Sequence, residues 1–113
     1  MSAKTIELGN SSISMQTEKK VDNLITLSQE LVMENPKKAL ALGKRAYQIS
    51  KELNYSLGMA QSLYAIAFAN RNLSDYDKTI PRLLEAIDIF VKLEHEKGEM
   101  KTRNLIGTSY FYL

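Results

Sequence analysis

The sequence predicts an all-α domain built from antiparallel helix hairpins, and three observations support this fold class. Apolar residues recur three and four positions apart over most of the chain, the spacing of helices with one buried face. Short polar stretches rich in Asn, Pro, Gly or Asp interrupt that pattern. The chain also resembles itself: laying 38–73 over 78–113, a shift of 40 residues, pairs seven identical residues in 36, where chance would give roughly two.

The N-terminal elements divide at Asn35 and Pro36. Residues 1–15 are polar, rich in Ser and without a sustained period, so we expect a disordered or weakly ordered leader there and a helical repeat domain over 16–113. The first helix begins near Gln16. Asn35 and Pro36 end it and open the second helix, because Asn caps well and Pro fits a first turn, where its missing N–H would have no partner. We expect the second helix to extend to about Leu53.

Three more helices follow the second one. The segment "NYSLG" separates it from a third helix over about 57–73, and "SDY" leads into a fourth over about 76–95. The segment "EKG" opens a fifth helix that we expect to continue to Leu113. Gly58 and Gly98 fall at equivalent turns, where we expect them to take the positive φ that ends a helix. Pro81 should bend or delay the fourth helix, because it cannot donate a backbone hydrogen bond.

Composition and charge narrow the class of protein. The chain of 113 residues has the length of one domain, and its formal charge of +2 arises from acidic and basic residues that alternate, which weakens a nucleic-acid-binding function. The absence of cysteine excludes disulfides and cysteine-ligated zinc. The longest apolar run, Leu63 to Ala69, is too short to cross a bilayer. The N-terminus has no apolar signal stretch, so we expect a cytoplasmic protein that does not associate with a membrane.

The repeating hairpin resembles the tetratricopeptide repeat (TPR) over about 16–113. The positions that carry the resemblance are Leu63, Ile66, Ala67 and Asn70 in one helix, then Thr79, Leu83 and Ala86 in the next, with a partial copy at Ile106, Gly107 and Tyr110. The spacing of 40 residues, longer than the usual 34, is similar to the extended-helix variety of bacterial regulatory proteins. The resemblance implies a short TPR-like solenoid of about two and a half repeats, a fragment of a longer array; the alternative is an unrelated helical bundle.

The resemblance also implies a concave groove lined by the first helices of successive repeats, in which a protein or peptide partner lies. Carried over by position, the groove residues are Ile25, Gln29, Val32, Tyr64, Phe68, Arg71, Asn72, Lys101, Asn104 and Thr108. Tyr64 and Phe68 lie four apart on one helical face, with Arg71 nearly one turn on, and these residue types concentrate binding energy in interfaces. The alternative is that Tyr64 and Phe68 pack only in the core.

Side chains suited to catalysis are few. His95 is the only histidine, and a histidine near a helix end is typical of a charge partner for the last carbonyls. Asp75 fits a helix cap better than a catalytic acid. We therefore expect no enzymatic activity, no cofactor and no metal site.

The function implied by the resemblance is that of a non-catalytic interaction or sensory module. We expect the N-terminal regulatory part of a bacterial signalling protein of the histidine kinase or nucleotide cyclase type. The alternative is a free-standing adaptor or chaperone that binds peptide segments in its groove.

The C-terminal helix is expected to mediate self-association. Its large apolar residues spread around more than one helical face, so the preceding hairpin cannot cover them all. We expect a two-fold dimer in which these residues meet their copies: Leu105, Tyr110, Phe111 and Leu113.

Overall fold

The computed structural model describes the backbone of residues 3–112 and the side chains of residues 17–111. Over that range all regular secondary structure is helical: α1 (Ala3–Leu31), α2 (Pro36–Glu52), α3 (Ser56–Asn72), α4 (Tyr76–Lys92), α5 (Glu96–Ser109) and the 3₁₀ helix η1 (Tyr110–Tyr112). The all-α fold of helix hairpins predicted from the sequence is confirmed.

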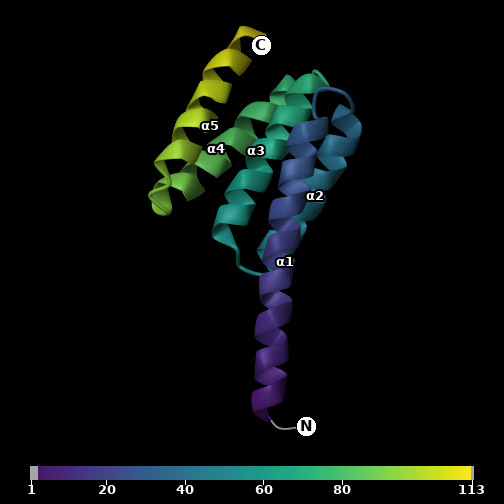
Figure 1. Cartoon of the computed structure of the whole chain (residues 1–113). Coiled ribbons are helices and arrows are strands. Elements are labelled where there is room, and N and C mark those ends of the chain that lie inside the picture. The colour runs from purple at the N-terminus through teal and green to yellow at the C-terminus, as the bar shows by residue number, and fades with distance from the viewer. Residues whose placement is uncertain (1–2, 113) are drawn as a thin grey trace.

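Each helix packs against the next one in the chain, and α3 lies at the centre (Figure 1). Besides its two neighbours in sequence, α3 also contacts α1 and α5, so the first helices of successive hairpins lie next to one another. The sequence of α3 suits this position, because it contains one charged residue, Arg71, and several alanines that let other helices approach closely. The largest fully buried side chains, Phe90, Leu63 and Leu83, lie between α3 and α4 or α5. Burying each one stabilises the fold by about 1.5–3 kcal/mol.

Three of the turns share one hydrogen-bonding pattern, and the helices that they connect begin at residues 36, 56, 76 and 96. The middle residue of each turn has a positive φ: Asn54 at 54°, Ser74 at 64° and Glu94 at 55°. In the first turn the Tyr55 N–H donates to the Ser50 carbonyl at 2.8 Å, and the equivalent bond recurs in the other two turns. This is the Schellman arrangement, which satisfies the last carbonyls of a helix.

The prediction that Gly58 and Gly98 take a positive φ is wrong, because both lie inside the first turn of the following helix. A Cβ at Gly58 would lie 2.5 Å from the Tyr55 ring, and one at Gly98 would collide with the rings of Phe90 and His95. These two glycines therefore allow an aromatic ring from the turn to pack down onto the next helix.

The ends of the first and last helices differ from the predicted ones. Helix α1 begins at Ala3, where we expected a start near Gln16. The leader predicted over 1–15 falls among residues whose side chains are not described, and it stays a prediction. Helix α5 ends at Ser109 and tightens into η1, where we expected an α-helix up to Leu113, a residue that lies outside the described part.

Helix α4 is continuous from Tyr76 through Pro81, so the expected delay is absent. The proline removes the N–H that would bond to the Asp77 carbonyl. Both residues are exposed, so water can satisfy that carbonyl, and the helix continues.

Candidate binding groove

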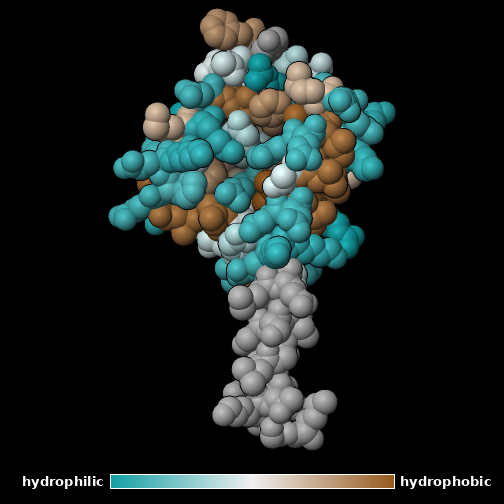
Figure 2. Space-filling model, in the orientation of Figure 1, coloured by the Kyte–Doolittle hydropathy of each residue, from teal (hydrophilic) through white to brown (hydrophobic). Residues whose placement is uncertain are grey.

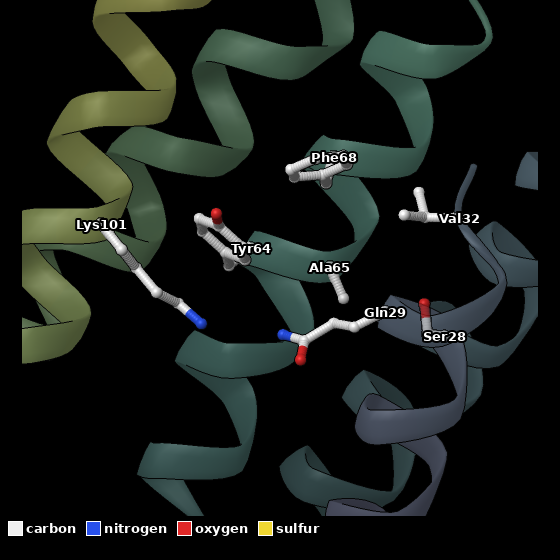
Figure 3. Close-up of a pocket in the computed structure, with 7 residues that line it drawn as sticks. All are labelled: Ser28, Gln29, Val32, Tyr64, Ala65, Phe68 and Lys101. Atoms are coloured by element: carbon white, nitrogen blue, oxygen red, sulfur yellow. The ribbon is translucent and has the colours of Figure 1, made fainter.

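A hollow of about 230 Å³ lies between α1, α3 and α5. Its wall is mostly apolar, and its lining residues come from all three helices: Ser28, Gln29, Val32, Tyr64, Ala65, Phe68 and Lys101 (Figure 3). On the face of the molecule seen in Figure 2, apolar patches lie between hydrophilic side chains. Because α1, α3 and α5 are the first helices of successive hairpins, the hollow lies where the sequence predicted a groove.

The floor of the hollow depends on small residues where α1 meets the rest of the domain. Ser28 is buried, and its hydroxyl donates to the Ala39 carbonyl at 2.7 Å, which ties α1 to α2. Ala65 on α3 is also buried and faces the hollow. Larger side chains at these two positions would fill the hollow or push α1 away.

Tyr64 and Phe68 form one wall, with ring centroids 6.1 Å apart and ring planes inclined by 50°. Both side chains are half-buried, and both pack beneath on a core cluster that contains Ala67, Leu83 and Leu105. Tyr64 and Phe68 were expected either to line the groove or to pack only in the core. Each ring does both, because it packs on the core cluster and also lines the hollow.

Lys101 of α5 lies beside Tyr64, on the side of the hollow away from Ser28 and Val32, with its Nζ 4.3 Å from the centroid of the Tyr64 ring. Figure 3 shows Lys101 extending toward Tyr64 from α5 and Gln29 extending toward it from α1. Burial, with a smaller contribution from Lys97, lowers the pKa of Lys101. Burial also raises the pKa of Tyr64, an effect that the Arg71 charge opposes. Among the described residues no carboxylate pairs with Lys101.

The hollow continues toward the C-terminal end of α3. Arg71 and Asn72, together with Phe68, line an adjacent depression of about 350 Å³. The Arg71 guanidinium donates to the Thr108 hydroxyl at 3.4 Å, and the Asn72 amide donates to the Phe68 carbonyl at 2.9 Å. Of the ten residues assigned to the groove from the repeat register, seven therefore line one of these two depressions, and Ile25 and Thr108 do not. Asn104 is exposed on α5 and lines neither of them.

At the other end of the groove lies a polar contact that sequence reasoning missed. The Tyr55 hydroxyl donates to the Asp22 carboxylate at 2.8 Å and joins α1 to the turn before α3. Burial, strengthened by this hydrogen bond and the Asp22 charge, raises the pKa of Tyr55 to about 12. The only feature of the sequence that points to this contact is that Tyr55, like His95 at the equivalent position 40 residues later, places a ring in the turn before a helix. Asp22 and Tyr55 both line a third depression, which extends to Gln29 and Lys101.

Of the residues predicted to mediate self-association, the structure buries one and exposes two others. Leu105 is 5% exposed and packs on Ala67 and Leu83, so its assignment to a contact surface is wrong. It is equivalent to Ala65 in the 40-residue register, a position that is also buried. In contrast, Tyr110 and Phe111 are 59% and 89% exposed, and Figure 2 shows an apolar group protruding at this end of the molecule. Leu113 lies outside the described residues.

The two polar residues considered at helix ends have roles different from the expected ones. The His95 Nδ1 accepts a hydrogen bond from the Gly98 N–H at 3.0 Å, so the ring caps the start of α5 and does not serve the last carbonyls of α4. Asp75 occupies the N-cap position of α4, but its side chain makes no cap bond; its carboxylate lies 3.9 Å from the Lys78 ammonium.

In the part of the chain that the structure describes, no group of three or more His, Cys, Asp or Glu side chains could hold a metal ion. Within the same residues, none of the helices combines the length and the apolar character needed to cross a bilayer.

The lining of the groove offers three kinds of contact. Tyr64 and Phe68 offer apolar surface, the Gln29 amide can hydrogen-bond to a backbone, and Lys101 offers a positive charge.

Comparison with models of protein families, with curated proteins and with solved structures found no match to this chain.

Proposed function

We propose that this chain is a TPR-like interaction module that binds a peptide segment of another protein in the groove between α1, α3 and α5. The observation that carries the proposal is the half-buried Lys101 ammonium, which lies over Tyr64 in a mostly apolar hollow and has no carboxylate partner among the described residues. A cation held in such a place costs free energy that an anionic partner would recover.

The charge around the groove favours a ligand that is both apolar and acidic. Lys97 and Arg71 lie close enough to Lys101 and Tyr64, respectively, to influence their pKa values. Helix α3, which forms the centre of the groove, has no acidic residue. A partner segment would therefore place an apolar side chain against Tyr64 and Phe68, and a carboxylate near Lys101.

For the cellular role we propose what the resemblance to the repeat family implies. A module without catalytic activity would act in the cytoplasm as the regulatory part of a bacterial signalling protein of the histidine kinase or nucleotide cyclase type. The second candidate is a free-standing adaptor or chaperone. The groove supports both roles equally, because either one requires only the capture of a peptide segment.

Self-association through the C-terminal end belongs to the proposal as well. In the 40-residue register Tyr110 is equivalent to Asn70, which is only 4% exposed. Tyr110 and Phe111, which lie in η1 after the end of α5, are instead 59% and 89% exposed. A second copy of the chain can cover this surface in a two-fold contact.

Selection of peptides from a random library, followed by isothermal titration calorimetry, tests the groove. We expect selected peptides to be enriched in acidic and apolar residues, and we expect Tyr64→Ala and Lys101→Gln to weaken their binding at least about tenfold. The chain offers a matched control pair outside the groove, since Lys51 lies 5.5 Å from the ring of Tyr47 on α2.

Tyr47→Ala and Lys51→Gln should leave the affinity unchanged. Equal losses in the control variants would overturn the proposal, because binding would then depend on general stability. Selection of peptides without acidic residues would overturn the assigned role of Lys101.

A further inference from the structure

A second cleft lies between α2 and α4, on the other side of α3 from the groove. Its volume is about 400 Å³, and its floor contains Ile66 and Asn70 of α3. These residues follow Tyr64 and Phe68 by two positions, which is a rotation of about 200° around a helix. We call it the α2–α4 cleft; it is independent of the proposed peptide site.

Asn70 is the unusual residue of this cleft. The residue is 4% exposed and lines the cleft, and its side chain makes no hydrogen bond to another described residue. The amide is open to the cleft, because among the described residues only the Ser62 hydroxyl is a fully buried side-chain polar atom without a partner. At the equivalent position 40 residues later the chain has Tyr110, and a ring of that size at position 70 would fill much of the cleft. Asparagine instead leaves the space open and offers it one donor group and one acceptor.

The charged residues at the rim are balanced. Two ion pairs on α4 and its N-cap occupy four of them: Lys78 with Asp75 at 3.9 Å and Arg82 with Glu85 at 3.6 Å. Lys44 on α2 and Asp77 on α4 form no ion pair with the described residues. The cleft thus has an unpaired cation on one wall and an unpaired anion on the other. Leu40 and Ile66 supply apolar surface between them.

We propose that the α2–α4 cleft binds a small zwitterion of the free amino acid class. The ligand carboxylate lies toward Lys44, its ammonium lies toward Asp77, and the Asn70 amide hydrogen-bonds to it. A volume of about 400 Å³ is within the range of small-molecule sites. A free amino acid fits better than a peptide. It carries an ammonium and a carboxylate on the same carbon, whereas a residue inside a peptide carries neither backbone charge.

Nuclear magnetic resonance titration of the ¹⁵N-labelled protein with single L-amino acids at millimolar concentration tests this proposal. At least one amino acid should shift the side-chain amide signals of Asn70 and the backbone signals of Lys44 and Asp77. The same amino acid with an acetylated amine and an amidated carboxyl group should produce no such shifts, because it lacks both charges.

Two variants identify the groups that bind. Asn70→Leu should weaken binding at least about tenfold and should leave the thermal unfolding midpoint close to that of the wild type, since the Asn70 amide makes no hydrogen bond to another described residue. Lys44→Gln should weaken binding, whereas Lys37→Gln, an exposed position on α2 outside the cleft, should not.

The proposal is overturned if no amino acid shifts the cleft signals, or if the shifts appear in the groove around Tyr64 and Phe68. Binding of the uncharged derivative with equal affinity, or binding of peptides alone, would also overturn it.

Discussion

Replacement of Gly98 by alanine tests the packing of the turns on the helices that follow them. Gly98 lies in the first turn of α5, where its N–H is capped by the His95 ring. A Cβ at this position would lie 2.7 Å from the His95 Nδ1 and would also overlap the Phe90 ring. Phe90 is fully buried, so it cannot move aside without disturbing the core between α3 and α4.

The expected magnitude is the difference between two opposing effects. Alanine at a helical position gains up to about 1 kcal/mol over glycine. Overpacking of a filled core costs about 1–3 kcal/mol, and loss of the cap on α5 costs about 1 kcal/mol more. We therefore expect Gly98→Ala to lower the free energy of unfolding by about 1–3 kcal/mol.

Gly107→Ala is the matched control on the same helix. A Cβ at Gly107 would have no heavy atom within 4 Å, so only the gain in helix propensity remains, and we expect a stabilisation of up to about 1 kcal/mol. Urea unfolding followed by circular dichroism at the helical band gives both values. If Gly98→Ala stabilised the protein as much as Gly107→Ala, the contact of the turn with α5 could not be the reason for the glycine.

Three further predictions concern the turns, the α1 contact and the C-terminal end. Glu94→Gly should raise the free energy of unfolding by about 1 kcal/mol, because it relieves a positive φ of 55°. Asn54→Gly should raise it less, since Asn tolerates this conformation better than Glu does. A larger gain for Asn54→Gly in urea unfolding would contradict this account. Folding raises the pKa of Tyr55 from 10.0 to about 12, so the free energy of unfolding should fall as the pH rises from 10 toward 12. If the free energy of unfolding of Tyr55→Phe fell equally over this pH range, Tyr55 could not be the cause. Phe111→Ser should reduce self-association in sedimentation experiments, and a monomeric wild-type protein at high concentration would contradict a C-terminal contact.

Most of the fold could be predicted because its signals are local. Asn35 and Pro36 mark a helix boundary by their own chemistry, and the three-and-four spacing defines the buried face of each helix. The turns could not be predicted as well, since residues other than glycine take the positive φ at Asn54, Ser74 and Glu94. Their conformation is set by the Schellman hydrogen bonds and by tertiary packing, which a propensity for glycine does not describe.

The candidate site could be predicted in part. Tyr64, Phe68 and Lys101 were assigned to one groove from the repeat register, and they do line one hollow. The contact between Asp22 and Tyr55 joins residues 33 positions apart in the chain, and no local pattern indicates it. Leu105 was misplaced because apolar spacing shows that a helix has a buried face but does not show which neighbour covers it.

Intermolecular nuclear Overhauser effects between a library-selected peptide and the aromatic ring protons of the protein test the central claim most directly. Binding in the groove predicts contacts from an apolar peptide side chain to the rings of Tyr64 and Phe68, together with contacts from an acidic residue to the Lys101 side chain. Contacts confined to side chains outside the groove, such as Tyr47 of α2, would contradict it.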